Sequence, residues 1–346
     1  MGNMSRINKT PLVSIITPTF NHGSFIEDCI DSVLAQTFED WEQIIMDDGS
    51  TDETYSIALK KAQSCERIKV ITQENIGLLR LSETYNKALK QAKGKYIAIL
   101  EGDDYWDKNK LMLQVAAMEE DENRVVCWGQ ATNIKSKTKQ IISVYPNPNS
   151  KESIYFDNKP VGNIMNVFLF NNCIPALTIL IRKEAIEKIG GFKQSFNLPL
   201  VDFPTLLDLS YIGEFKFIPA SLGYYRVFVE QATKTLTSEI ANGVYQLRKH
   251  HILKCEVERS KVINMSMKEF EEVNKAILIM EYSRSGRYEL IRKNFSLART
   301  HYIKSLTSFG FRAPMWKVRS LVGYFFSLFR MDVEFISSIV GKGRIG

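Results

Sequence analysis

The stretch Tyr96-Ile-Ala-Ile-Leu-Glu-Gly-Asp-Asp-Tyr-Trp106 is a short apolar run that ends abruptly at three acids, Glu101, Asp103 and Asp104. The run is too short for a helix and follows the turn signal Lys93-Gly94-Lys95, so it predicts a buried central strand. In an open parallel sheet, ligands bind beyond the carboxyl ends of the strands, which is where the three acids would lie. Crowded carboxylates repel one another unless a cation or a donor-rich ligand neutralises them.

Two interpretations of these acids follow from the chemistry of oxygen ligands. Magnesium and manganese bind through one or two carboxylates and complete their shells with water and phosphate oxygens, which favours a metal-chelated diphosphate. The alternative is a solvated turn in which Asp104 or Asp107 caps the following helix. This stretch alone does not decide between them.

The first hundred residues alternate short β-rich runs with segments of helical periodicity. The runs occur at 12–17, 41–46, 68–72 and 96–100. This alternation predicts βαβ units in a mostly parallel sheet that is flanked by helices. Pro18 to Asn21, Asp47-Asp48 and Glu101 to Asp104 would then meet along one edge and form a crevice of nucleotide size. Neither a G-x-G-x-x-G after the first strand nor a G-x-x-x-x-G-K-[ST] occurs, which argues against dinucleotide and P-loop sites.

Composition is that of a folded protein. The chain has 346 residues, of which 45% are hydrophobic and 24% charged, which suits one sizeable domain plus an appendage. The five cysteines form no C-x-x-C pair and predict buried thiols in a reducing compartment. Residues 1–11 contain no apolar core, so we expect no secretory signal and a cytoplasmic location.

Charge is distributed unevenly along the chain. The net charge is +6, but residues 241–346 carry +10 and the first 240 residues carry −4. This asymmetry predicts a separate C-terminal surface with its own partner, and a merely solvated helical face is the alternative. A nucleic-acid partner is not expected, because the basic region is strongly apolar and lacks a recognisable motif.

Three signatures follow one another in the first two thirds of the chain. They are Val13-Ser-Ile-Ile-Thr-Pro-Thr-Phe-Asn21, Asp47-Asp-Gly-Ser-Thr-Asp52 and Leu100-Glu-Gly-Asp-Asp104. In order and spacing they resemble the signatures of the second family of inverting glycosyltransferases, over about Pro11 to Arg226. The resemblance implies the GT-A fold, which is Rossmann-like, with a mostly parallel central sheet flanked by helices. It also implies an enzyme of bacterial surface polysaccharide or glycan biosynthesis.

The resemblance implies a role for each residue of the donor site. Pro18 and Phe20 would lie near the nucleotide base, and Asp48 would accept a hydrogen bond from it, usually from uracil. Glu101 would face the ribose, and Asp103 would coordinate the Mn²⁺ or Mg²⁺ ion that bridges the diphosphate.

Three further positions fit the family pattern less closely. Asp104 would either support the metal shell or cap the next helix. Phe228 stands where relatives often carry the histidine of Tyr-Arg-Val-His, so Arg226, Gln231 or Lys234 would compensate by contacting phosphate directly. Thr84-Tyr85-Asn86 stands where relatives often carry Ala-Arg-Asn, so the arginine equivalent is missing.

Gly190-Gly-Phe192 and Val201-Asp202-Phe203 resemble the family's acceptor-side segment, in which an aspartate that opens a helix is the catalytic base. Val201 stands where relatives often have glutamate, so only Asp202 can carry the role. Inversion by direct displacement needs one carboxylate to deprotonate the acceptor hydroxyl, on the face opposite the leaving diphosphate. An ordinary helix N-cap is the alternative interpretation.

We expect two regions. A GT-A catalytic domain would span 1–230, with a nucleotide-sugar half at about 11–105 and an acceptor half at about 106–230. A basic helical C-terminal region would span 231–346. Periodicity there predicts helices at 243–257, 267–283 and 288–305, with a loop at Ser285-Gly286 between the last two.

The last segment, 321–340, is rich in large apolar residues but holds Arg330, Asp332 and Glu334 near its centre. Each charge would be costly at mid-bilayer, so a spanning helix is not expected. Segment 312–344 could instead lie on the anionic inner surface of a membrane, as a peripheral contact. A buried packing helix or a homodimer interface is the alternative.

These features predict a metal-dependent glycosyltransferase that moves a sugar from a nucleotide-diphosphate donor, UDP-linked, to a hydroxyl of a glycan or lipid-linked saccharide. Processive relatives carry Q-x-x-R-W, which this chain lacks, so transfer of a single sugar is expected. One competing class is a non-catalytic nucleotide-sugar or membrane-binding module. The other is a sugar nucleotidyltransferase, but such enzymes place a glycine-rich, basic loop after the first strand, and 17–25 is not one.

Overall fold

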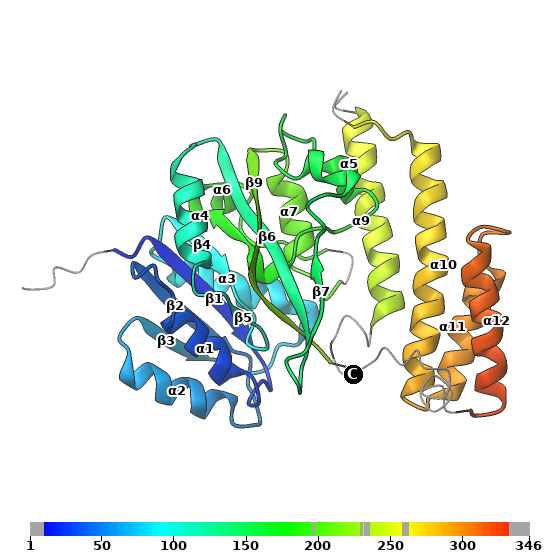
Figure 1. Cartoon of the computed structure of the whole chain (residues 1–346), viewed down its shortest axis with the longest axis horizontal. Helices are drawn as coiled ribbons and strands as arrows, with labels where there is room; N and C mark the ends of the chain where they lie inside the picture. Colours follow the sequence, from blue (N-terminus) through cyan, green and yellow to red (C-terminus); the bar gives the residue numbers. More distant parts are fainter. Residues whose placement is uncertain (1–9, 196–197, 229–230, 232–235, 258–262, 332–346) are drawn as a thin grey trace, which may run out of the picture. The chain divides into compact units, whose positions relative to one another are not determined.

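The computed structural model describes residues 10–195, 198–228, 231, 236–257 and 263–331, without the side chains of 255–257. The chain divides into two compact units (Figure 1). The first consists of Met1–Val167, Asn172–Gln194 and Leu200–Arg226, and the second of Phe168–Asn171, Ser195–Pro199 and Val227–Gly346.

The first unit is built on a mixed nine-stranded sheet. Its path runs in the order β3-β2-β1-β4-β8-β6-β9-β5, and β7 pairs with β6 at the side of this path. The first four strands are parallel, whereas β8 is antiparallel to both β4 and β6. The strands are β1 (Val13–Thr19), β2 (Trp41–Asp47), β3 (Ile68–Thr72), β4 (Tyr96–Ile99), β5 (Tyr105–Trp106), β6 (Arg124–Lys135), β7 (Ile141–Tyr145), β8 (Leu180–Arg182) and β9 (Glu214–Val227).

Helices flank this sheet, as the alternating pattern predicts (Figure 1). They are α1 (Ile26–Leu34), α2 (Thr54–Ser64), α3 (Leu81–Gln91), α4 (Lys110–Glu119), α5 (Met165–Phe168), α6 (Lys183–Lys188) and α7 (Asp202–Leu209), with short 3₁₀ turns at Leu78–Arg80, Lys151–Tyr155 and Ala176–Thr178. Strands β1 and β4 are buried along their whole length, and α1 contributes its apolar face to the same core. The apolar runs therefore form the centre of the fold.

The register of the parallel strands brings their carboxyl ends together. Thr19 at the end of β1 pairs with Asp47 at the end of β2, and Ile16 pairs with Ile99 at the end of β4. The loops that follow these three strands therefore leave the sheet at one edge. The α/β architecture expected from the sequence is confirmed.

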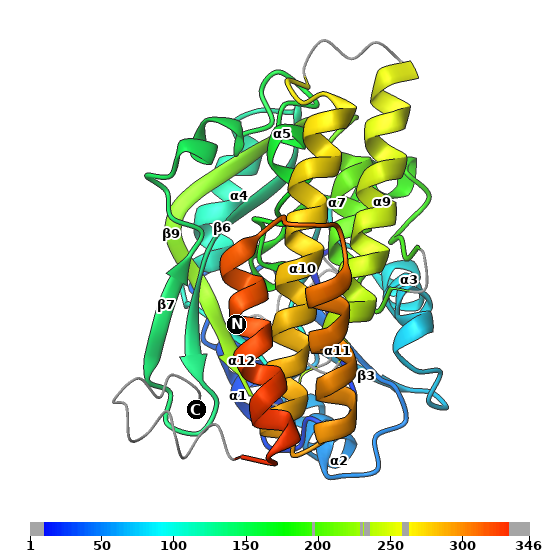
Figure 2. The ribbon, with the colours of Figure 1, turned by 90° about the vertical axis from the view of Figure 1, so that its right-hand side faces the viewer.

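The second unit consists mainly of helices α9 (Thr237–Val257), α10 (Met267–Ile291), α11 (Phe295–Thr307) and α12 (Pro314–Leu328). Figure 2 shows α10, α11 and α12 side by side, with α9 along α10. Helix α10 begins with a capping box, in which the Ser266 side chain accepts from the Glu269 amide and the Glu269 carboxylate accepts from the Ser266 amide.

The predicted loop at Ser285-Gly286 is wrong, because both residues lie inside α10. Gly286 is required by close helix packing and not by a turn. A Cβ atom at this position would lie only 2.6 Å from Cε1 of Tyr302 in α11. Helix α10 therefore continues to Ile291, and the next helix begins only at Phe295.

Candidate active site

The three acids after β4 form one cluster. Glu101, Asp103 and Asp104 each offer a carboxylate oxygen, and these oxygens all lie within 4.8 Å of one another. The loop that carries them lies against the end of β1, where the Gly102 amide donates to the Pro18 carbonyl at 3.1 Å. A Cβ atom on Gly102 would lie 2.5 Å from Oγ1 of Thr19, so only glycine allows this close approach.

Burial and mutual repulsion disfavour negative charge in this cluster. Burial, and then the charge of Asp103, raise the pKa of Glu101 to about 7. Burial is also the main cause that raises the pKa of Asp104, again with a contribution from Asp103. A divalent cation would reverse this balance, because it favours the ionised carboxylates and prefers oxygen ligands. The donor set therefore fits Mg²⁺ or Mn²⁺.

Two neighbours hold the cluster in place by hydrogen bonds. Tyr85, which α3 supplies, is buried, and its hydroxyl donates to Oε1 of Glu101 at 2.7 Å. The backbone amide of Arg226 donates to Oδ1 of Asp104 at 2.8 Å. Asp104 thus ties the acid loop to β9. The alternative in which it caps the next helix is not observed, since α4 begins after Asn109 without a side-chain cap.

The Arg226 side chain is buried beneath the acid loop. Its Nη1 donates to the backbone carbonyl of Asp103 at 2.7 Å, and its Nη2 forms an ion pair with Asp28. The guanidinium carbon lies 5.1 Å from the ring centroid of Phe25 and 4.7 Å from that of Tyr105. These contacts fix the guanidinium between α1 and the acid loop, where it supports the backbone of Asp103.

Asp48 lies at the end of β2 and anchors the loop that follows β3. Its carboxylate accepts from Nε2 of Gln73 at 2.6 Å and from the amides of Ile76 and Gly77 at 3.2 and 3.3 Å. A carboxylate has about four acceptor positions, so these three donors leave room for one more.

The loops after β1 and β2 are bonded directly to each other. Asn21 accepts from the Thr51 amide and donates its own amide to Oγ of Ser50, both at 2.9 Å. Pro18 lies within β1 beside Met46, and the Phe20 side chain just beyond this strand is 42% exposed. An aromatic ring is thus presented to solvent one residue after Thr19, whose carbonyl accepts from the Asp48 amide at 2.9 Å.

Asp202 is the first residue of α7, and its carboxylate accepts from Nδ2 of Asn172 at 3.3 Å. Burial raises its pKa above 3.8, although hydrogen bonds from the Phe203 amide and Asn172 oppose this shift. The charge of Asp202 in turn contributes to the raised pKa of both Glu101 and Tyr85. The fold therefore lets the charge of Asp202 act on Glu101, about a hundred residues earlier in the sequence.

Three supporting residues were not singled out from the sequence: Tyr85, Asn172 and Gln73. Tyr85 left a signal, because it stands where the resembled family often has arginine. Gln73 and Asn172 left none, since an isolated amide in a loop has no periodicity or spacing that indicates a partner. Arg80, near the same loop, forms a bidentate pair with Glu83 and is not directed to the acids by any bond in the described residues.

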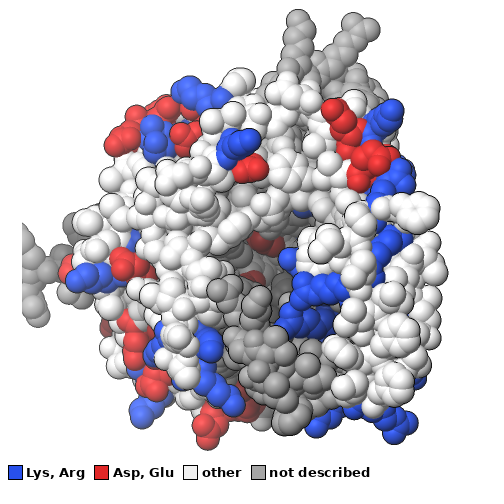
Figure 3. All heavy atoms as spheres, turned by 45° about the vertical axis from the view of Figure 1, so that its right-hand side comes forward, with Lys and Arg blue, Asp and Glu red and all other residues white. Residues whose placement is uncertain are grey.

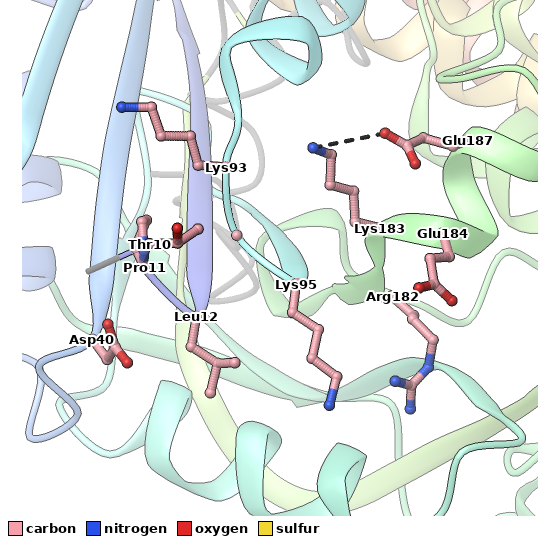
Figure 4. Close-up of a pocket in the computed structure, with 11 residues that line it drawn as sticks. Thr10, Pro11, Leu12, Asp40, Lys93, Lys95, Arg182, Lys183, Glu184 and Glu187 are labelled. Carbon is pink, nitrogen blue, oxygen red and sulfur yellow. Dashed lines mark ion pairs between the residues drawn. The ribbon is translucent and has the colours of Figure 1, made fainter. Parts of the chain in front are cut away.

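A cavity of about 560 Å³ lies elsewhere in the first unit, at the amino ends of β1 and β4. Figure 4 shows lysine, arginine and carboxylate side chains around it, with Lys183 pointing toward Glu187, at 3.7 Å. Four basic and three acidic residues line it, so its charge is nearly balanced. It therefore offers no clear preference for an anionic ligand. The lining residues are Thr10, Pro11, Leu12, Asp40, Lys93, Gly94, Lys95, Arg182, Lys183, Glu184 and Glu187.

Comparison with known sequences finds glycosyltransferases as the relatives of this chain. The profile described as "Glycosyl transferase family 2" matches residues 14–188. TuaG of Bacillus subtilis (strain 168), a glycosyltransferase whose description names teichuronic acid biosynthesis, is 36% identical over 53% of this chain and 66% of its own length. The uncharacterized glycosyltransferase RP339 of Rickettsia prowazekii is 30% identical over 67% of this chain and 69% of its own length. The chain thus spans about two thirds of these relatives.

Solved structures confirm the GT-A type of fold. S. aureus TarS in complex with UDP-GlcNAc superposes with a TM-score of 0.56 at 14% identity, covering 94% of this chain and 92% of that one. The mannosyltransferase PcManGT of Pyrobaculum calidifontis, in complex with GDP-Man and Mn²⁺, gives a TM-score of 0.53 at 16% identity, covering 97% and 88%.

Proposed function

Because the chain belongs to glycosyl transferase family 2, we propose that it moves a single sugar from a UDP-linked donor to an acceptor hydroxyl, with inversion at the anomeric carbon. The observation that carries this proposal is the convergence of Glu101, Asp103 and Asp104 beside the loops that hold Asp48 and Phe20. The UDP-GlcNAc complex of TarS supports a uridine donor, and the Mn²⁺ complex of PcManGT supports a metal.

The base would bind between the loops after β1 and β2. Phe20 and Pro18 would contact the ring, and the remaining acceptor position of Asp48 would receive the imide N–H of uracil. The hydrogen bonds from Gln73, Ile76 and Gly77 hold that carboxylate still. Its orientation would therefore not have to be acquired on binding.

The diphosphate would bind through Mn²⁺ or Mg²⁺ held by Asp103 and Asp104, while Glu101 would accept hydrogen bonds from the ribose. When bound, the metal supplies positive charge that offsets the negative charge developing on the leaving diphosphate. Arg226 supports the carbonyl of Asp103, which favours a positioning role for it. Its direct contact with phosphate stays a prediction from the sequence.

Asp202 would deprotonate the acceptor hydroxyl. It has to be ionised for this step, and the hydrogen bond from Asn172 stabilises the ionised form while it orients the carboxylate. The attacking oxygen would then approach the anomeric carbon from the side opposite the diphosphate, which gives inversion.

The acceptor would be a glycan or a lipid-linked saccharide of bacterial polysaccharide or glycolipid assembly, as the description of TuaG suggests. We place the enzyme in the cytoplasm, with residues 1–230 as the catalytic domain and 231–346 as a separate helical region. A lipid-linked acceptor would call for contact with the inner membrane surface through 312–344, of which 332–344 lie outside the described residues. A homodimer interface is the competing use of that region.

The test is release of nucleoside diphosphate from a panel of nucleotide sugars with Mn²⁺ and an extract of bacterial glycolipids as acceptor. Native protein and Asp107→Asn should consume one donor selectively, whereas Asp103→Asn should not. Asp107 is a suitable control because it lies in the same region outside the cluster, and asparagine keeps the oxygen that accepts from the Asn109 amide. Equal consumption by all three proteins would refute the role of the acids.

The competing classes give different products. A nucleotidyltransferase would form a nucleotide sugar from UTP and a sugar 1-phosphate, with release of pyrophosphate. A non-catalytic module would bind nucleotide with metal but release no diphosphate with any donor. The anomeric configuration of the product, read by proton NMR, tests inversion, and its chain length tests transfer of a single sugar.

A further inference from the structure

Helix α12 has the reverse of the usual burial pattern. Its buried residues are the small ones, Ser320, Gly323 and Ser327. Ser320 hydrogen-bonds Ser305 at 2.8 Å, and a Cβ atom on Gly323 would lie 2.3 Å from Cζ of Tyr302. A surface helix of a globular protein normally turns its large apolar residues inward. In α12 only Tyr324 and Phe326 among the large side chains of 321–328 pack, partly buried, against the neighbouring helices.

Most of the large apolar side chains of this segment face solvent. Of the 25 exposed large apolar side chains in the described part of the chain, nine lie within 311–331. They are Phe311, Met315, Val318, Leu321, Val322, Phe325, Leu328, Phe329 and Met331. At 100° per residue, those from Met315 to Phe329 fall within an arc of about 140° and extend for about 21 Å along the helix. We call this surface the α12 apolar face.

The charges around the α12 apolar face have one sign. Residues 295–331 include six Lys and Arg residues and neither Asp nor Glu. Lys317 and Arg319 lie at the two borders of the apolar arc, by the same helical count. Arg312 is offset by an ion pair with Glu272 of α10. In Figure 3, uncharged surface over the C-terminal helices adjoins groups of lysine and arginine side chains.

We propose that the α12 apolar face docks on the surface of a bilayer that contains anionic phospholipids, with α12 parallel to the membrane. The large side chains would enter the boundary between headgroups and acyl chains, and Arg319 would reach the phosphates from its border. The Lys317 ammonium instead donates to the carbonyls of Leu306 and Ser308, at 2.7 and 2.8 Å. Within the described residues, no helix has the length and apolar character needed to cross a bilayer, which agrees with a helix lying on the surface.

Charge favours a lipid surface over a second copy of the chain. Pairing two such faces would bring together two sets of five basic residues, Arg312 being offset by Glu272, without acidic partners in the same segments. Anionic headgroups remove this repulsion. The proposal deepens the proposed function, since it would carry the enzyme to a lipid-linked acceptor, but it rests on the geometry of α12 alone.

The test is cosedimentation of the full-length protein with sonicated vesicles. Vesicles of phosphatidylcholine with 30% phosphatidylglycerol, roughly the anionic content that creates a marked surface potential, are compared with pure phosphatidylcholine. The variant is Met315→Gln/Phe329→Gln, at side chains that are 78% and 72% exposed. The matched control is Ile141→Gln/Ile154→Gln, at side chains of the first unit that are 64% and 72% exposed.

The native protein and the control should bind the anionic vesicles, and the α12 variant should bind at least about tenfold more weakly, because two large apolar side chains no longer enter the membrane. Binding should also fall in 0.5 M salt and with pure phosphatidylcholine. Because the substituted side chains are exposed, thermal unfolding should be unchanged, which excludes misfolding.

Three outcomes would overturn the proposal: no vesicle binding by the native protein, equal loss in the control, or a salt-resistant dimer that the α12 variant dissociates. Vesicle binding is measured without donor or acceptor. A protein that binds vesicles but releases no diphosphate would therefore refute the proposed transfer and leave the membrane proposal standing.

Discussion

The hydrogen bond between Tyr85 and Glu101 can be removed by deleting one atom. Tyr85→Phe keeps the ring, which is 2% exposed, and removes only the hydroxyl that donates to Glu101 at 2.7 Å. Glu101 meanwhile remains close to the charges of Asp103 and Asp202. The substitution therefore leaves a crowded carboxylate without this donor.

The size of the effect follows from the type of bond. A hydrogen bond to a charged group contributes about 1.5–3 kcal/mol. The lower end of this range applies here, because the Glu101 side chain is only partly buried and retains some contact with solvent. About 1.4 kcal/mol corresponds to a tenfold change in an equilibrium constant. If Glu101 accepts from the ribose, we expect the Kd for UDP with Mn²⁺ to rise about tenfold in Tyr85→Phe.

Isothermal titration calorimetry measures this change, and Tyr302→Phe provides a matched control. Tyr302 is 3% exposed and lies in α11, which belongs to the other unit. The same substitution there should leave the Kd for UDP unchanged. A Kd within twofold of the native value in Tyr85→Phe would refute the assignment of Glu101 to the donor site, and an equal rise in both variants would point to a general loss of structure.

Three further predictions concern the base, the helices and the pH dependence of stability. Asp202→Asn should reduce the rate of sugar transfer by about 10²- to 10⁴-fold with unchanged UDP affinity, and retained transfer would exclude Asp202 as the base. Because burial raises the pKa of Asp202, the activity of the native protein should be lost on the acid side at a pH above 3.8. Gly286→Ala should lower the free energy of unfolding in urea by about 1–3 kcal/mol, since the new methyl would lie 2.6 Å from Tyr302, and an unchanged midpoint would contradict the packing seen here. Burial lowers the pKa of His251 from 6.5 to about 4, so the stability that its neutral form contributes is fully present above pH 6.5, and about 3 kcal/mol of it is lost as the pH falls toward 4. His251→Gln should flatten this dependence in urea titrations, and an unchanged pH dependence in this variant would contradict the assignment.

Sequence patterns were most informative where local structure decides the outcome. The parallel strands were predictable because each apolar run ends at turn residues, and the meeting of Asp48 with Glu101 and Asp103 at one edge follows from parallel strand direction. The resemblance to the family then gave each acid a role that the strand pattern alone does not supply.

Contacts between residues that are far apart in the sequence could not be predicted. Arg226 bonds to Asp28, 198 residues away, and Asn172 bonds to Asp202, 30 residues away, and neither pair has a spacing that indicates contact. The sequence predicted a loop at Gly286, because glycine often marks a turn. The residue that requires glycine there, Tyr302, lies on another helix and is not indicated by the local sequence. The direction of the apolar face of α12 could not be predicted for the same reason. Periodicity indicates that one face of a helix is apolar, but not whether this face points inward or toward solvent.

The central claim is that the acids after β4 bind a metal-chelated nucleoside diphosphate, and calorimetric titration of UDP with and without Mn²⁺ tests it most directly. The account predicts that native protein and Asp107→Asn bind UDP tightly only with Mn²⁺, and that Asp103→Asn loses the metal-dependent part. Equal UDP affinity with and without Mn²⁺ in the native protein, or an unchanged metal dependence in Asp103→Asn, would contradict it.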